Sequence, residues 1–228
     1  LSIRRQRQMC KETGRDLLQL ALDAAHEAGD VTYGAFGRTH LVTQLLAAGD
    51  PLDVVQQAAE AGLDFAREAH FGLVVDRITG QRQLARTLRG LTPTFGCFDD
   101  DAFDEERFER HLAADSRLAL AACWYWVRKL QARFLAGAYS AAMAAAAEAD
   151  RLLWTSPAFF ERAEYHFYAA LARAAVCSAA PEAERTGHLE ALVAHHNQLL
   201  EWSENCPENF ENRAALIGAE IARLQGRE

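Results

Sequence analysis

ALAACWYWVRKLQARFLAGAYSAAMAAAAEADRLLW, residues 119–154, is the stretch that decides the fold of this chain. Its first half places bulky apolar side chains at helical spacing, which predicts a helix with one face toward a core. Gly137 interrupts this pattern, and residues 141–149 are then nearly all alanine, the strongest helix former with the smallest hydrophobic side chain. A bulky helix, a glycine turn and a narrow helix predict an antiparallel pair, because small residues can receive large ones.

The predicted pair agrees in part with a tetratricopeptide repeat. Trp126 stands eleven residues before Gly137, near the aromatic position of that repeat, and Ala149 falls on a small-residue position of its second helix. Lys129 stands where the repeat has an apolar residue, and Trp154 replaces its closing proline. We therefore expect a diverged tetratricopeptide-like array, with an irregular helical domain as the alternative.

Further helices are predicted on both sides of the central pair from apolar periodicity and from Gly and Pro stop signals. They span residues 3–28, 32–48, 51–68, 71–91, 104–114, 157–177, 182–202 and 208–224. Ser156 and Pro157 are expected to cap and open the sixth of these. No run of alternating β-branched residues predicts a strand. The expected class is all-α, with about ten helices in antiparallel pairs stacked as a right-handed array.

A second diverged repeat is predicted near the N-terminus, where residues 45–49 resemble the segment that ends at Gly137. Ala58 and Ala61 follow Gly49 much as Ala146 and Ala149 follow Gly137. We expect one continuous helical domain with three parts. These are N-terminal repeats over residues 1–91, an irregular loop with a short acidic helix over 92–114, and C-terminal repeats over 115–228.

The composition is that of a globular protein, since half of the 228 residues are apolar and a quarter are charged. The net charge of −8 and the pI near 5.5 argue against binding to nucleic acid or to an anionic membrane, because an acidic surface repels phosphate. No signal peptide is visible, and the longest apolar run is far shorter than the roughly 20 residues of a spanning helix. We therefore expect a cytoplasmic protein without membrane insertion.

The five cysteines are scattered along the chain without a CxxC pair. They predict reduced thiols rather than a disulfide framework or a zinc site. The chain also begins at Leu1, within a predicted helix and without a methionine. This beginning leads us to expect a fragment of a longer protein.

Residues 99–106 hold six acidic side chains and are the best candidate for a metal site, because closely spaced oxygen ligands suit calcium or magnesium. A calcium loop that begins at Asp99 would need glycine in place of Asp104 and glutamate in place of Arg110. A solvated loop followed by acidic residues in the first turn of a helix fits the pattern better. We therefore expect no metal.

No stretch of the chain predicts catalysis or a bound cofactor. Residues 90–96 lack the Gly-Lys-Ser/Thr ending of a phosphate-binding loop. His195 and His196 are adjacent on a predicted helix and so point in different directions, which is poor geometry for one metal. His166 lies among aromatic residues, and all three histidines are interpreted as core or boundary residues. A nucleophile elbow and an HExxH sequence are both absent.

Several sequence phrases together resemble a known kind of protein segment. They are Thr39-His40-Leu41 with Gly49-Asp50-Pro51-Leu52, Leu88-Arg89-Gly90-Leu91-Thr92-Pro93 with Phe98-Asp99, Cys123-Trp124-Tyr125-Trp126 with Lys129-Leu130-Gln131-Ala132, Phe159-Phe160-Glu161 with Tyr165-His166-Phe167-Tyr168, and Glu204-Asn205-Cys206-Pro207-Glu208-Asn209-Phe210. They are similar to the helical segment of large bacterial multi-sensor signalling kinases, and the resemblance covers most of the chain.

This resemblance implies a place within a multidomain protein of a two-component signalling system. In that family a serine/threonine-kinase-like domain and an AAA or STAND-type predicted ATPase precede the helical segment. GAF and histidine-kinase domains follow it. None of the family's catalytic motifs lies within these 228 residues, so any kinase or ATPase activity would belong to the parent protein.

Two functional hypotheses follow. The first is an interaction and regulatory module that couples the ATPase part to the sensor-kinase part through contacts with other domains, other signalling proteins or a second copy of the chain. Its candidate surface is the polar and aromatic loop that holds Phe95, Phe98, Asp99, Asp100 and Asp101. Local packing of the two rings is the simpler interpretation and is favoured over this surface.

The second hypothesis is a small-molecule sensor with a pocket between helices. Trp124, Trp126, Phe160 and Tyr165 are the candidate walls of this pocket. Aromatic side chains at helical spacing are more often part of a core, which favours the interaction module.

Overall fold

The computed structural model describes the backbone of residues 3–226 and the side chains of residues 14–226. Over this part of the chain the fold is all-α, as predicted, with no β-strand apart from one isolated bridge. The α-helices are α1 Ile3–Glu27, α2 Val31–Ala48, α3 Leu52–Glu68, α4 Gly72–Leu88, α5 Glu105–Ala113, α6 Ala119–Leu135, α7 Tyr139–Leu152, α8 Phe160–Ala179, α9 Glu182–Asn205 and α10 Pro207–Leu224. None of these helices is long and apolar enough to cross a membrane.

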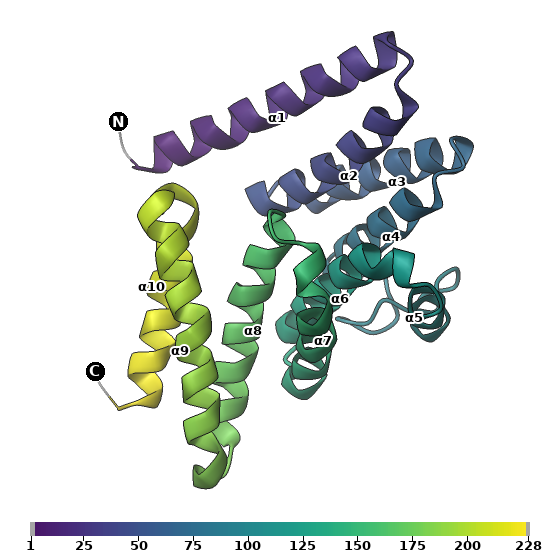
Figure 1. The fold of residues 1–228 in the computed structure, drawn as a ribbon. Coiled ribbons are helices and arrows are strands. Elements are labelled where there is room, and N and C mark those ends of the chain that lie inside the picture. Colours follow the sequence, from purple (N-terminus) through teal and green to yellow (C-terminus); the bar gives the residue numbers. More distant parts are fainter. Residues whose placement is uncertain (1–2, 227–228) are drawn as a thin grey trace.

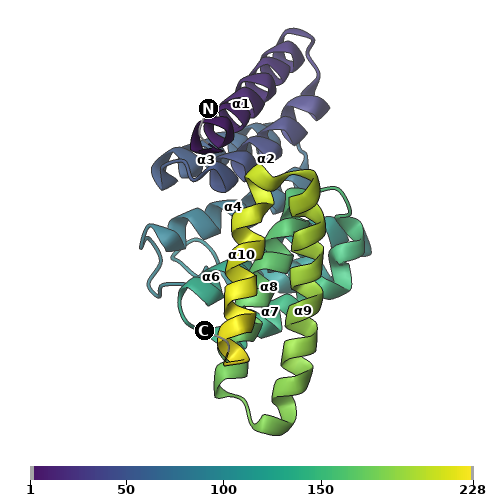
Figure 2. The same ribbon diagram turned by 90° about the vertical axis from the view of Figure 1, so that its left-hand side faces the viewer.

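The helices pack in neighbouring pairs and build a stacked array (Figure 1). α2, α4, α6, α8 and α10 contact one another in that order and form one layer. α3, α7 and α9 each pack between two members of this layer, α9 lying beside both α8 and α10 (Figure 2). This alternation is the arrangement expected of a helical repeat array.

The alternation is broken after α4. Residues 89–104 and the short helix α5 stand where the array would place an outer helix between α4 and α6 (Figure 1). α4 and α6 still pack directly on each other, and Gly80 lies at their contact, where a Cβ atom would be 3.4 Å from the Cα of Tyr125. The layer is therefore continuous across the break.

The central pair has the predicted turn. Gly137 adopts φ 73°, a left-handed conformation that glycine reaches without steric cost. Its N–H donates to the Phe134 carbonyl at 2.9 Å, and the Ala138 N–H donates to the Arg133 carbonyl at 2.9 Å. These two bonds satisfy carbonyl groups that the end of α6 would otherwise leave without partners.

The alanine face of α7 receives the bulky face of α6, as the sequence predicts. Val127 and Leu130 are fully buried against Ala142, Ala146 and Ala149. Alanine allows the two helix backbones to approach closely, so the larger side chains of α6 fill the space between them. Truncation of a fully buried leucine in such a core typically costs about 2–5 kcal/mol of stability.

The predicted register of the second repeat is wrong by one residue. Ala58 is only partly buried and Ala61 is exposed, whereas Ala59 and Gly62 face the neighbouring helices. The reason is that two residues separate Gly49 from the start of α3, but only one separates Gly137 from the start of α7. Aligned on their first helical residues, the small buried positions of α3 and α7 coincide.

The predicted cap of the long aromatic helix is also wrong. α8 begins at Phe160, and Phe159 occupies its N-cap position without a side-chain hydrogen bond. Ser156 is instead fully buried, and its Oγ accepts a hydrogen bond from Trp124 Nε1 at 3.2 Å. A buried indole N–H needs an acceptor, so the Ser156 hydroxyl bonds to Trp124 in the core and does not cap the helix.

Candidate interaction pocket

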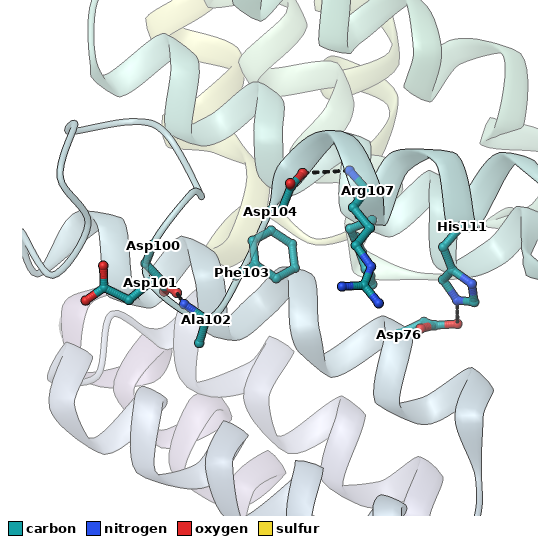
Figure 3. A pocket seen from close by; sticks show the side chains of 9 residues that line it. Asp76, Asp100, Asp101, Ala102, Phe103, Asp104, Arg107 and His111 are labelled. Atoms are coloured by element: carbon teal, nitrogen blue, oxygen red, sulfur yellow. Dashed lines mark hydrogen bonds and ion pairs between the residues drawn. The ribbon is translucent and has the colours of Figure 1, made fainter.

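An open cavity of about 510 Å³ lies at the break in the array, between α4 and α5 (Figure 3). Its walls are Asp76, Asp100, Asp101, Ala102, Phe103, Asp104, Arg107, Phe108 and His111. Asp76 belongs to α4. The wall residues between 100 and 104 belong to the irregular segment, and Arg107, Phe108 and His111 belong to α5. The cavity exists because an outer helix is missing at this place in the array.

Local hydrogen bonds set the conformation of the segment that lines the pocket. Asp100 Oδ1 accepts the Ala102 N–H at 2.8 Å, and the Asp100 N–H donates to the Phe103 carbonyl at 2.9 Å. This tight turn is typical of aspartate, whose short side chain can bond to backbone two residues ahead. Asp104 then caps α5 by accepting the Arg107 N–H at 2.7 Å.

The segment is also tied to α4. Arg86 Nε donates to Asp100 Oδ2 at 2.9 Å, and Gln83 Nε2 donates to the Phe98 carbonyl at 2.7 Å. Gln83 is fully buried, so its bond to the loop backbone is shielded from water. These contacts hold one end of the pocket in place.

α6 fixes the same segment from the other side. Arg133 donates to the Gly96 carbonyl at 2.6 Å and to Glu105 Oε2 at 2.6 Å. Glu105, in turn, accepts the Phe98 N–H at 2.5 Å and forms an ion pair with Lys129 at 2.9 Å. The loop is thus irregular in shape but has fixed partners on two helices.

The residues of the predicted interaction surface do not all lie on one surface in the structure. Phe98 is fully buried and stacks edge to face on Tyr125, so for this ring local packing is confirmed and its place on the candidate interaction surface is wrong. Phe95 is 49% exposed and lies outside the pocket walls. Asp99 accepts the Glu105 N–H, whereas Asp100 and Asp101 line the pocket.

The pocket is acidic, because its walls hold four aspartates and one arginine. His111 Nε2 lies 3.0 Å from Asp76 Oδ2. Burial raises the pKa of Asp76, and the hydrogen bond with His111 acts in the opposite direction. Burial also acts to raise the pKa of Asp100, but hydrogen bonds from Ala102, Gln83 and Arg86 outweigh it and hold that pKa below its usual value. Asp100 is therefore ionised at neutral pH.

Two aromatic rings add an apolar wall. Phe103 and Phe108 lie 5.2 Å apart between ring centroids, and Phe108 also contacts Tyr125 at 5.2 Å. These two rings, Asp76 and His111 were not predicted from the sequence as site residues. The one available signal was Asp76 itself, a carboxylate inside the apolar pattern of residues 71–91.

The four rings of the alternative hypothesis make different contacts. Trp124 is 1% exposed and lies against Arg77, and Tyr165 donates to Asp150 at 2.9 Å. Trp126 is partly buried beside Lys129. Phe160 faces a cavity of about 340 Å³, whose other aromatic walls are Phe159, Trp202 and Phe210.

A buried polar seam joins α2, α4, α6 and α8. Arg128 and Glu161 form an ion pair of 2.7 Å, with side chains 2% and 1% exposed. Thr43 donates to Glu161 at 2.6 Å, and Gln81 donates to Thr43 at 2.7 Å. Each hydrogen bond here satisfies a group that would be costly to bury alone. This seam was not predicted from the sequence.

His166 and His195 meet between α8 and α9, with their Nδ1 atoms 3.1 Å apart. Burial, together with a neighbouring positive charge, lowers the pKa of His166 to about 3 and that of His195 to about 4. Both rings are therefore neutral at pH 7, and one donates to the other. This pairing agrees with their interpretation as packed histidines.

No group of three or more His, Cys, Asp and Glu side chains among the described residues could hold a metal ion; the side chain of Cys10 lies outside that part. Comparison with known protein families, with curated proteins and with solved structures finds no match to this chain. The α4–α5 pocket therefore has to be interpreted from its own shape and charge.

Proposed function

We propose that this chain is a non-catalytic interaction module whose α4–α5 pocket binds a basic segment of another domain or protein. The observation that carries the proposal is the combination of an open cavity of about 510 Å³, an excess of carboxylates and two phenylalanine walls. A charged pocket with apolar walls matches the guanidinium of an arginine, which is flat, cationic and weakly hydrated.

Both parts of the pocket contribute to this recognition. Asp101 and Asp104 can accept charge-assisted hydrogen bonds, and because both are exposed each ion pair is worth up to about 1 kcal/mol. The faces of Phe103 and Phe108 attract a cation by about 0.5–1 kcal/mol at a solvent-exposed site. Because α4 and α6 already fix the segment, little conformational entropy is lost on binding.

The resemblance in sequence supports a wider context for this module. We propose that it lies in the cytoplasmic part of a multi-sensor signalling kinase, where it couples an ATPase-type domain to GAF and histidine-kinase domains. In this proposal the catalytic work belongs to other domains of the parent protein, and the pocket receives a basic segment from one of them.

The test uses a short peptide, acetyl-Gly-Arg-Arg-Gly-amide, titrated into the 228-residue protein and followed by calorimetry. Asp101→Asn should weaken binding about two- to fivefold, since it removes an exposed carboxylate from the pocket without breaking a described hydrogen bond. Arg107→Gln should strengthen it, because the one competing guanidinium is lost. Added salt should weaken binding to the native pocket.

Asp64→Asn is the matched control, because Asp64 is an exposed aspartate of α3 outside the pocket. It should leave the peptide affinity unchanged. Equal affinities for the Asp101→Asn and Asp64→Asn proteins would show that the peptide does not use this pocket, and the proposal would then fail.

A further inference from the structure

A second cavity, of about 340 Å³, lies between the start of α8 and the turn that joins α9 to α10. Figure 2 shows these three helices side by side. The cavity walls are Pro157, Ala158, Phe159, Phe160, Arg162, Ala163, Trp202 and Phe210. Four of the eight are aromatic, so the cavity offers a large apolar surface with one charged group.

That charged group is an arginine without a counter-ion. Arg162 Nε is buried and has no hydrogen-bond partner, and no ion pair to this side chain is found within the described part of the chain. Arg213, which lies over the face of Phe160, differs because it is paired with Glu164 at 2.5 Å. Nε itself has no accessible surface, but Arg162 lines the cavity and has no ion pair within the described part of the chain, so its guanidinium is the contact for an anion.

A second arginine lies behind the aromatic wall, and the charge of Glu161 acts on it. Arg77 is 3% exposed, and its guanidinium carbon lies 4.1 Å from the ring centre of Trp124 and 5.7 Å from that of Phe159. Its Nε and Nη2 atoms have no hydrogen-bond partner among the residues described. Burial lowers the pKa of Arg77 to about 10, so it still carries its charge at pH 7.

The charge of Glu161 is shared among several groups. Glu161 follows Phe160 directly, but its carboxylate accepts bonds from Arg128 and Thr43. Arg162 is therefore the one charged side chain in the cavity wall, and apolar walls strengthen its attraction for an anion.

We propose that this cavity binds a small organic anion, a carboxylate attached to an aromatic or branched aliphatic group. The carboxylate pairs with the Arg162 guanidinium in the cavity wall, and the apolar part lies among the four rings. A volume of about 340 Å³ is at the small end of the range for ligand pockets and suits a molecule of about ten to fifteen non-hydrogen atoms. This site is separate from the α4–α5 pocket, and its proposed ligand is tested independently of the peptide proposed for that pocket.

The test uses phenylacetate as the probe and phenylacetamide as its neutral counterpart of nearly the same shape. Titration of the 228-residue protein, followed by calorimetry and by ligand-observed NMR, should show saturable one-to-one binding of phenylacetate. The amide should bind at least about tenfold more weakly, because it cannot form a charge-assisted bond to Arg162.

Three variants locate the site. Arg162→Gln should reduce the affinity for phenylacetate by about tenfold or more and remove the preference for the acid over the amide. Arg117→Gln is the matched control, because Arg117 is an exposed arginine paired with Asp115 away from the cavity, and it should bind as the native protein does. Ala158→Trp should abolish binding of both probes by filling the cavity from the exposed turn.

Three results would overturn the proposal. They are equal affinity of the native protein for acid and amide, unchanged affinity of a folded Arg162→Gln protein, and unchanged affinity of the Ala158→Trp protein. Absence of saturable phenylacetate binding at millimolar concentration would also overturn it. A failure here leaves peptide binding at the α4–α5 pocket untouched, since the two sites share no residue.

Discussion

Two helix ends use the same left-handed turn with different residues. Gly137 ends α6 at φ 73°, and His70 ends α3 at φ 54°. At the second turn the His70 N–H donates to the Arg67 carbonyl at 3.0 Å, and the Phe71 N–H donates to the Ala66 carbonyl at 2.8 Å. The hydrogen bonds match those at Gly137, but a residue with a Cβ atom costs roughly 1–2 kcal/mol in this conformation.

Gly137→Ala should therefore lower the free energy of unfolding by about 1 kcal/mol. The added Cβ would meet no atom within 4 Å, so backbone strain is the whole cause. His70→Gly should raise the free energy of unfolding by about 0.5–1 kcal/mol, because relief of the strain exceeds the extra entropy of the unfolded chain. Urea unfolding followed by circular dichroism measures both changes.

Gly187→Ala is the control for this pair. Gly187 lies within α9, in a helical conformation and with open space around its Cα, so alanine should stabilise the protein by about 0.5–1 kcal/mol. If Gly137→Ala behaved like Gly187→Ala, the strain at the first turn would be absent.

At the scale of the elements, the pair Arg128 and Glu161 links α6 to α8, and Thr43 extends the link to α2. Glu161→Gln should cost about 3 kcal/mol or more, because it leaves a buried guanidinium without its counter-ion. Arg128→Met should cost a similar amount. The double variant should cost less than the sum of the two, with a coupling energy of at least about 1 kcal/mol.

A double-mutant cycle by urea unfolding measures this coupling. The exposed pair Arg117 and Asp115 is the comparison, because solvent screens it and its coupling should stay below about 1 kcal/mol. Additive costs for Arg128 and Glu161 would mean that the buried pair does not act as a unit.

The helices themselves could be predicted because their ends carry local signals. Glycine or proline marks most of the turns, and helix periodicity covers the rest. The start of α8 was misplaced because Ser156 looks like a cap in sequence, whereas the buried Trp124 indole, far away along the chain, takes its hydroxyl as an acceptor. The seam around Arg128 escaped prediction for the same reason, since its partners come from other helices.

At the scale of the whole molecule, the paired histidines make stability depend on pH. The folded-state pKa values of His166 and His195, about 3 and about 4, lie below the ordinary value of 6.5. Below pH 6.5 the unfolded chain binds protons that the folded chain does not, so stability decreases as the pH falls toward 4. Between pH 7 and pH 5 the loss should be about 1–2 kcal/mol for each ring.

Chemical unfolding at a series of pH values tests this dependence. The double variant His166→Phe with His195→Leu should flatten the change between pH 7 and pH 5. His26→Gln, at an exposed position of α1, should leave it unaltered. A native protein with equal stability at pH 7 and pH 5 would contradict burial of neutral rings.

The α4–α5 pocket could be predicted from the sequence only in part. The acidic loop was visible because its residues are contiguous. Asp76 and His111 are 35 residues apart, and only the packing of α4 beside α5 brings them to one wall. Phe98 could not be told from Phe95 by sequence, because the difference between them is the position of Tyr125 behind the loop.

The contact of Thr43 with Glu161 spans 118 positions of the chain. In an open solenoid each repeat touches only its neighbours, so its ends can melt while its middle stays folded. Here the second helix and the eighth are bonded directly to each other and to the helix between them. Opening either of them breaks a shared buried network, so these helices form one cooperative unit rather than a row of separately melting repeats.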